Sequence, residues 1–201
     1  MRARLAIASA GITVELREIL LRDKAPEFLA TSPKGTVPVL KAEQTIEESI
    51  DIMHWALAQS DPEGLLHPMT GQGLALIREN DGPFKTALDR TKYAVRYPHI
   101  DPAQSRADAA AFVTKLDAQL AGQPWLLGDA AALADLAILP FVRQFAHVDV
   151  AWWDVQPWPH AQRWLAAFKA SDRFAAIMTK HAPWKSGQDS VLFMHTPQRA
   201  P

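Results

Sequence analysis

The chain has 201 residues, of which 48% are hydrophobic and 21% charged, a composition that can bury a core and excludes disorder for the chain as a whole. Its 21 Lys and Arg and 22 Asp and Glu nearly cancel, so the basic excess typical of a nucleic-acid-binding protein is missing. Because the sequence contains no cysteine, disulfides, Cys-ligated metals and a Cys nucleophile from this sequence are excluded. The longest stretch without an acidic or basic residue, 64–77, contains Gly and Pro and is too short to span a membrane.

The first sixty residues mix helical and strand patterns. Strand patterns occupy residues 13–20, 37–42 and 45–48, and the second of these carries a proline that cannot donate to a ladder. Helices are expected over residues 1–10, 24–30 and 49–60, the first ending at Gly11 and the last carrying an apolar stripe. This order predicts a small α/β domain.

The rest of the chain has only helical patterns, expected over residues 74–80, 81–97, 102–121, 133–148, 157–171 and 172–181. Asp81-Gly-Pro83 is expected to cap the second of these helices, and the tail from Ala182 is expected to be poorly anchored. The sequence therefore predicts two domains, over residues 1–61 and 74–201, joined by a linker at 62–73.

Searches for common catalytic motifs find nothing. There is no GxGxxG, Walker A, GxSxG or HExxH pattern, and the seven histidines lack the spacing of metal ligands. We therefore predict no metal site. The tryptophans gather in the second half of the chain, where core packing is the simplest interpretation of most of them.

Two short segments nevertheless have the features of a binding site. In the first, Lys34-Gly-Thr-Val37-Pro38, a Val-Pro bond joins a loop to a strand, a place where a cis bond can occur. A cis bond would turn the Val37 N–H and C=O outward, free to pair with an extended peptide. In the second, Glu48-Ser49, a hydroxyl stands at the start of a helix, where backbone N–H groups and the helix dipole favour a carboxylate.

Together these positions match one kind of ligand. Glu48 would hold an ammonium group and Lys34 a second carboxylate, so the four positions suit a short peptide with two carboxylates and one α-ammonium, as in glutathione. Each segment also has a purely structural interpretation, because Val-Pro is common and Glu-Ser is an ordinary way to begin a helix.

These segments carry a resemblance to bacterial, cytosolic glutathione S-transferases. Residues 32–40 resemble the turn and cis-proline strand of that family, and residues 46–53 are similar to its Glu/Asp-Ser segment, which binds the γ-glutamyl end of glutathione. Residues 133–140, after Gly128-Asp129, resemble its buried helix. The resemblance implies an α/β thioredoxin-like N-terminal domain and an all-α C-terminal domain, with Lys34, Val37, Pro38, Glu48 and Ser49 as glutathione contacts.

Two features depart from the family pattern. The capping box of the buried helix would have Ser or Thr three residues before Asp135, where this chain has Ala132. Residues 1–7 look like the interior of the family's first helix, so the opening strand and the catalytic loop are not in this sequence. Either the true start lies upstream or the protein is a shortened form, and no catalytic residue can be assigned.

The resemblance implies an enzyme that conjugates or exchanges glutathione, as co-substrate, with a hydrophobic electrophile. Candidates for the electrophile pocket are Phe84, Tyr93, Tyr97 and Trp153. A cytoplasmic homodimer that binds neither nucleic acid nor membrane is expected. The alternative is a related protein that binds glutathione or a protein partner and catalyses nothing.

Overall fold

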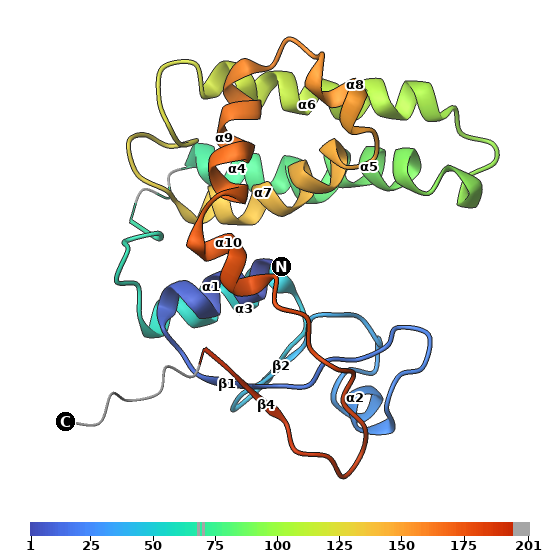
Figure 1. Cartoon of the computed structure of the whole chain (residues 1–201), viewed down its shortest axis with the longest axis vertical. Coiled ribbons are helices and arrows are strands. Elements are labelled where there is room, and N and C mark those ends of the chain that lie inside the picture. Colours follow the sequence, from blue (N-terminus) through green and yellow to red (C-terminus); the bar gives the residue numbers. More distant parts are fainter. Residues whose placement is uncertain (68, 70, 195–201) are drawn as a thin grey trace. The chain divides into compact units, whose positions relative to one another are not determined.

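A computed structural model describes residues 1–67, 69 and 71–194. The chain divides into two compact units, one formed by residues 1–63 together with the C-terminal segment from Asp172, and the other by residues 64–171 (Figure 1). The sequence places the segment from Asp172 in the helical domain, whereas in the structure it lies with the first unit. No helix in the described residues is long and apolar enough to cross a membrane.

Two helices form the centre of the first unit. Helix α1 (Arg2–Ala10) packs against α3 (Ser49–Gln59), and α10 (Asp172–Ile177) packs against α1. The contact faces combine small residues with larger ones: Leu5 and Ala6 of α1 and Met53 of α3 are fully buried. Alanines let the two helix backbones approach closely, and Gly11 ends α1 in the left-handed conformation, with φ 67°, which glycine adopts without strain.

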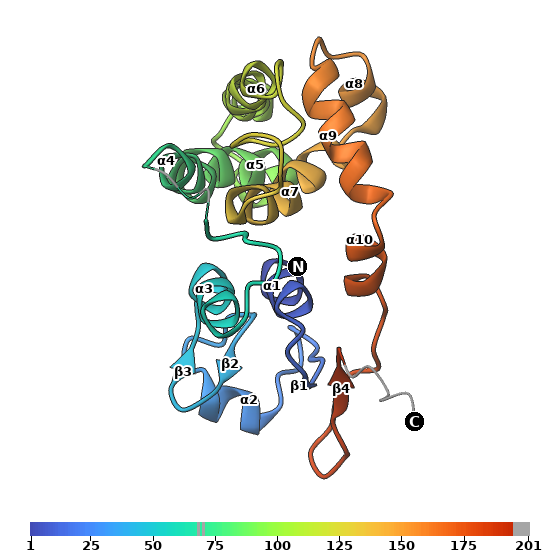
Figure 2. The ribbon, with the colours of Figure 1, turned by 90° about the vertical axis from the view of Figure 1, so that its left-hand side faces the viewer.

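The strands of this unit form two separate antiparallel pairs (Figure 2). Strand β1 (Val14–Leu16) pairs with β4 (Val191–Phe193), with Glu15 opposite Leu192. Strand β2 (Leu40–Lys41) pairs with β3 (Thr45–Ile46), and the short helix α2 (Pro26–Thr31) lies between β1 and β2 in the sequence. Strands β1, β2 and β3 are shorter than the segments predicted from the sequence, and β4 was not predicted.

Several contacts hold residues 182–194 in place, so the expectation of a poorly anchored tail is wrong for this part of the chain, and its last residues, 195–201, lie outside the described residues. The Trp184 backbone N–H donates to the Glu18 carbonyl at 2.6 Å, and the Arg17 guanidinium lies 4.7 Å from the centre of the Trp184 ring. Phe193 is 5% exposed and lies under the guanidinium of Arg4. The composition of the tail does not reveal these partners because all of them come from the first twenty residues.

The elements in the described part of the second unit are helices or helical turns, joined by loops. Its elements are α4 (Gly71–Glu79), the π-helical turn η1 (Asn80–Phe84), α5 (Lys85–Lys92), the 3₁₀ turn η2 (Ala94–Arg96), α6 (Pro102–Gln119), α7 (Leu133–Ala146), α8 (Val150–Asp154) and α9 (Pro159–Lys169). The expected break at Asp81-Gly-Pro83 does not occur. Pro83 has no N–H to donate, and the wider π turn carries the helix past it without a cap.

Helix α7 is the centre of the second unit, since eleven of its fourteen residues are buried around its whole circumference. A row of aromatic rings packs beside it. The ring centre of Phe84 lies 4.8 Å from that of Phe112 and 5.9 Å from that of Phe145. The Phe145 ring in turn contacts Trp152 and Trp153. Burial of these rings accounts for the concentration of aromatic residues in this part of the sequence.

A buried carboxylate joins three parts of the second unit. Asp135, which is fully buried, accepts hydrogen bonds from the backbone N–H groups of Leu126 and Ala132 at 3.0 and 2.9 Å and from the Trp164 indole at 3.0 Å. Burial raises the pKa of Asp135 to about 6, although these three donors oppose the rise. Ala132 has no hydroxyl to complete the capping box, so Asp135 supplies the side-chain contacts at this helix start.

Replacing Phe193 should test how firmly the tail is attached. We expect Phe193→Ala to lower the free energy of unfolding by about 3 kcal/mol, because it empties a buried site between β4 and α1. The matched control is Leu192→Ala on the same strand, where the side chain is 52% exposed and the expected change is below about 0.5 kcal/mol. Urea unfolding followed by circular dichroism measures both; equal effects would contradict the anchoring.

The pH dependence of stability should show the burial of Asp135. The pKa of Asp135 is about 6 in the folded protein and near 3.8 in the unfolded chain. Between these two pH values the folded protein therefore holds a proton on Asp135 that the unfolded chain has lost. The free energy of unfolding should therefore fall as pH rises from 4 to 7, by up to about 3 kcal/mol from this group.

Asp135→Asn isolates that contribution, because an amide does not titrate. The stability advantage of the unmodified chain over Asp135→Asn should be larger at pH 4 than at pH 7, measured by urea unfolding at each pH. Asp129→Asn, in the exposed turn before α7, serves as the control. An advantage of equal size at both pH values would contradict the assignment.

Candidate functional site

The hairpin of the first unit brings the two segments singled out in the sequence together. Strands β2 and β3 pair with Leu40 opposite Ile46, so the residues before β2 lie alongside those after β3. The Val37–Pro38 peptide bond is cis, and Val37 is 47% exposed. No hydrogen bond within the described residues engages the Val37 backbone N–H or C=O, so both groups can pair with an extended ligand.

The start of α3 offers further donors at the other end of the hairpin. Glu48 is the N-cap, and the first hydrogen bond of the helix runs from the Ile52 N–H to the Glu48 carbonyl at 3.0 Å. Among the described residues, the N–H groups of Ser49, Ile50 and Asp51 have no acceptor, and the Ser49 hydroxyl has no hydrogen-bond partner. Since α3 is eleven residues long, its dipole adds to these donors, and the position favours an anion.

The charged side chains of the site form a small cluster. The Lys34 ammonium lies 3.6 Å from a carboxylate oxygen of Glu47 and 3.8 Å from one of Glu48. Lys34 and Glu48 are 62% and 66% exposed, so these ion pairs are weak and easily exchanged for contacts with a ligand.

Glu47 is the one member of this cluster that sequence reasoning missed as a site residue. Its second carboxylate oxygen accepts from the hydroxyl of Ser32 at 2.7 Å, and Ser32 is fully buried. The hydrogen bond from Ser32 therefore holds the Glu47 carboxylate in position beside the Lys34 ammonium. The only signal available in the sequence was a second glutamate beside Glu48, which alone does not distinguish a structural role from an exposed charge.

The candidate pocket residues of the second unit do not form one wall. Phe84 and Trp153 are 1% and 5% exposed and belong to its aromatic core, and each lines a different hollow. Tyr93 lies beneath the cations of Lys92 and Arg96, at 4.8 and 4.4 Å from its ring centre. Of the four, Tyr97 offers the largest exposed ring, with 37% of the residue accessible.

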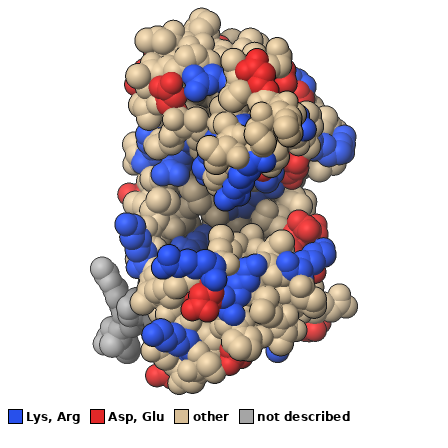
Figure 3. Space-filling view, turned by 90° about the vertical axis from the view of Figure 1, so that its right-hand side faces the viewer, with Lys and Arg blue, Asp and Glu red and all other residues tan. Residues whose placement is uncertain are grey.

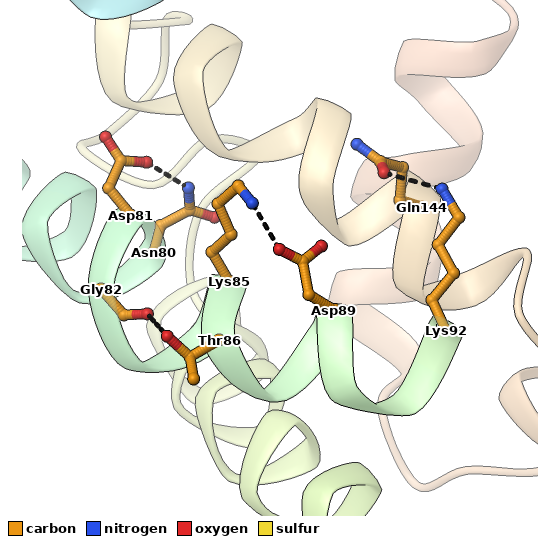
Figure 4. A network of polar contacts seen from close by, with 8 residues as sticks. All are labelled: Asn80, Asp81, Gly82, Lys85, Thr86, Asp89, Lys92 and Gln144. Atoms are coloured by element: carbon orange, nitrogen blue, oxygen red, sulfur yellow. Dashed lines mark hydrogen bonds and ion pairs between the residues drawn. The ribbon is translucent and has the colours of Figure 1, made fainter. Parts of the chain in front are cut away.

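Polar contacts line α5 and the π turn beside it (Figure 4). The Lys85 ammonium pairs with Asp89 at 2.5 Å, Lys92 donates to the Gln144 side-chain carbonyl of α7 at 3.2 Å, and Thr86 donates to the Gly82 carbonyl. Of these contacts, only the one from Lys92 to Gln144 joins the segment to another helix, α7, and the other two lie within the segment. Because these polar groups are paired with one another, we assign them a structural role. Side chains of this kind do not form an apolar pocket.

No group of three or more His, Asp or Glu side chains in the described part of the chain is arranged to hold a metal ion. Acidic and basic side chains are mixed over the face shown in Figure 3, where the basic ones are the more numerous. The chemistry available on the first unit is therefore hydrogen bonding and charge, supplied by backbone N–H groups, one hydroxyl, one ammonium and carboxylates.

Comparison with known proteins gives the same result for both units. Residues 1–64 match the family model "Glutathione S-transferase, N-terminal domain", and residues 86–167 match "Glutathione S-transferase, C-terminal domain". The maize protein Glutathione S-transferase 4 is 30% identical over 195 residues, covering 88% of this chain and 87% of that protein. This chain belongs to the glutathione S-transferase family. The resemblance found in the sequence and the fold class it implied, thioredoxin-like first and all-helical second, are thus confirmed.

Other relatives extend the comparison. Glutathione S-transferase GstB of Escherichia coli K12 is 29% identical over 150 residues, covering 69% of this chain and 71% of that protein. A glutathione transferase family member from Pseudomonas fluorescens pf-5, solved with two glutathione bound, has a TM-score of 0.71 at 21% identity, covering 87% of this chain and 85% of that one. Probable elongation factor 1-gamma 2 of Arabidopsis thaliana is 25% identical over 90% of this chain but only 50% of its own length.

Proposed function

We propose that this glutathione S-transferase family member binds glutathione on its first unit and conjugates or exchanges it with a hydrophobic electrophile. The observation that carries the proposal is the set of free backbone donors and acceptors on the two sides of the hairpin, at Val37 and at the start of α3. An unpaired N–H and C=O at Val37 suit the peptide backbone of glutathione, and the donors at Ser49 suit its γ-glutamyl carboxylate.

Charge adds to this match. Glu48 is placed to accept the α-ammonium group of glutathione, while Lys34 can leave its weak ion pairs to meet the glycine carboxylate. Lys34, Val37, Pro38, Glu48 and Ser49 are therefore the proposed contacts, and Glu47 lies beside Lys34, held by the Ser32 hydroxyl.

The proposed reaction uses the sulfur of glutathione, because the chain itself has no cysteine. The thiol loses its proton to solvent, and the resulting thiolate attacks the electrophilic carbon. A carbon–sulfur bond forms while the bond from that carbon to the leaving group breaks, and the leaving group departs with the electron pair. N–H donors at the start of a helix stabilise a thiolate. No residue of the chain is assigned as the group that holds this thiolate.

The electrophile pocket is the less defined part of the proposal. Tyr97 is the candidate with the most exposed side chain, whereas Tyr93 lies beneath two cations and Phe84 and Trp153 are buried in the aromatic core. A cytoplasmic location stays a prediction.

A non-catalytic role is the second candidate, and the likeness to an elongation factor 1-gamma favours it. The two are separated by incubating the chain with glutathione and an activated aryl halide. Formation of the thioether faster than in buffer supports the enzyme. Binding of glutathione with no acceleration supports the non-catalytic role.

Substitution of Ser49 provides the sharpest test of the glutathione site. We expect Ser49→Ala to weaken glutathione binding about ten- to a hundred-fold, because it removes a hydrogen bond to a carboxylate. Lys34→Ala should cost about five-fold or less, since the ammonium is exposed and screened by solvent. Calorimetry measures both.

The control for these variants is Lys41→Ala, which removes an exposed charge from the same hairpin without touching the proposed contacts. Its affinity should equal that of the unmodified chain. Undetectable binding by the unmodified chain, or full binding by folded Ser49→Ala, would contradict the glutathione site and leave the family assignment as it stands.

We also expect a homodimer with two-fold symmetry, as the family resemblance implies. Sedimentation equilibrium at micromolar concentration should give twice the monomer mass of 22.2 kDa. A single species of the monomer mass would contradict this expectation.

A further inference from the structure

One lysine of the proposed glutathione site stands where a ligand ammonium group is expected. The Lys34 ammonium lies 3.6 Å from a carboxylate oxygen of Glu47 and 3.8 Å from one of Glu48. Both distances are longer than a hydrogen bond, so Lys34 lies between two carboxylates without being held tightly by either. The α-ammonium group of a peptide has the same charge and the same three donors, and it is not tethered to the chain. A ligand ammonium and Lys34 therefore compete for the same two carboxylates.

Glu47 is the better ammonium partner of the two glutamates. Its side chain is 23% exposed, against 66% for Glu48, so solvent screens its charge less. One of its oxygens accepts a hydrogen bond of 2.7 Å from the hydroxyl of Ser32, which is fully buried. The other oxygen faces Lys34 and accepts no hydrogen bond within the described residues. Glu47 is thus restrained by one oxygen and offers the other to a ligand.

The position of the two glutamates also suits an α-amino acid group. In such a group the ammonium and the carboxylate are attached to the same carbon atom, so the sites that bind them must be neighbours. The N–H groups proposed to bind the carboxylate begin at Ser49, and Glu47 and Glu48 directly precede it in the sequence. One short segment can therefore bind both charged groups of a γ-glutamyl residue.

We propose that Glu47 and Glu48 together bind the α-ammonium group of glutathione, in the place that the Lys34 ammonium occupies in the structure. The displaced Lys34 then turns to the glycine carboxylate of the same ligand. This inference rests on the proposed glutathione site. It adds Glu47 as a specificity-determining residue and Lys34 as a competitor that the chain itself supplies.

The exchange links the two ends of the ligand. A peptide with an α-ammonium but no glycine carboxylate displaces Lys34 and gives it no new partner. A peptide with a glycine carboxylate but no ammonium draws Lys34 away and leaves Glu47 and Glu48 without a cation. Only a ligand with both groups replaces each ion pair that it breaks, so the site discriminates against peptides that lack either group.

Three probes separate these cases when each is titrated into the full chain by calorimetry at pH 7. They are glutathione, its glycyl ethyl ester, which lacks the glycine carboxylate, and glutaryl-cysteinyl-glycine, which lacks the amino group. Glu47→Gln should weaken glutathione binding about five-fold and should not weaken binding of glutaryl-cysteinyl-glycine. The glutamine side chain still accepts from Ser32, so the fold should be kept. Because loss of a negative charge otherwise favours an anionic ligand, a loss confined to glutathione identifies the ammonium contact.

Lys34→Ala gives a test of opposite sign. It should tighten binding of the ethyl ester about two- to five-fold, because the ester no longer has to displace the lysine. Glutathione binding should still be weakened, since its glycine carboxylate loses a partner. A lysine that only contacted the glycine carboxylate would leave the affinity for the ester unchanged. Lys34 is 62% exposed, so this variant should fold.

Glu43→Gln is the matched control, because Glu43 is an exposed glutamate in the turn of the same hairpin. It should leave the affinity for all three probes unchanged. Circular dichroism checks the fold of each variant.

Three results would overturn this inference while leaving the proposed glutathione site as it stands. These are no weakening of glutathione by Glu47→Gln, equal weakening of glutathione and glutaryl-cysteinyl-glycine by Glu47→Gln, and an affinity for the ester that Lys34→Ala does not raise. Undetectable binding of glutathione by the unmodified chain would overturn both.

Discussion

The helical unit depends on one buried carboxylate. Asp135 takes the place of water for the N–H groups of Leu126 and Ala132 and for the indole of Trp164, and these three donors belong to a loop, the start of α7 and α9. Removing the carboxylate from solvent is costly, as its raised pKa indicates, and three hydrogen bonds offset that cost. An apolar residue at this position would leave two backbone donors and one indole buried without acceptors, so the packing of α9 on α7 requires a polar group here.

A different constraint controls the first unit, where the site is built from a short stretch of chain. Nine residues lie between Pro38 and Glu48, and the hairpin that they form sets the positions of both ends. Because this geometry is local, the sequence predicted part of it: the Val37–Pro38 segment and the start of α3 at Ser49 follow from turn and helix-start residues. The sequence did not predict that the Lys34 ammonium lies 3.8 Å from a carboxylate oxygen of Glu48. The bounds of the long helices also follow, since their apolar periodicity extends over several turns.

What the sequence did not reveal depends on partners far along the chain. Strand β4 forms because β1 offers an edge some 180 residues earlier, and three residues of β4 carry too little pattern to predict alone. The π turn at Pro83 is a second case: Asp-Gly-Pro has the composition of a cap, yet burial of Phe84 against Phe112 favours a helix that continues. Ser32 and Glu47 are a third, because a serine and a glutamate acquire a shared role only when the hairpin brings them to 2.7 Å. In each case tertiary contact overrides the local preference.

In the proposed glutathione site, backbone groups should contribute more to the binding free energy than charged side chains do. Lys34 is largely exposed and already faces two carboxylates, so exchanging these for a ligand carboxylate changes the energy little. The N–H groups at the start of α3 and the backbone of Val37 have no such competitors within the described residues, and they present the same donors whatever side chain each residue carries. A site built in this way tolerates substitution of its neighbours, provided that the hairpin and the helix start keep their geometry. The same architecture is therefore compatible with family members that share only 29–30% of their residues with this chain.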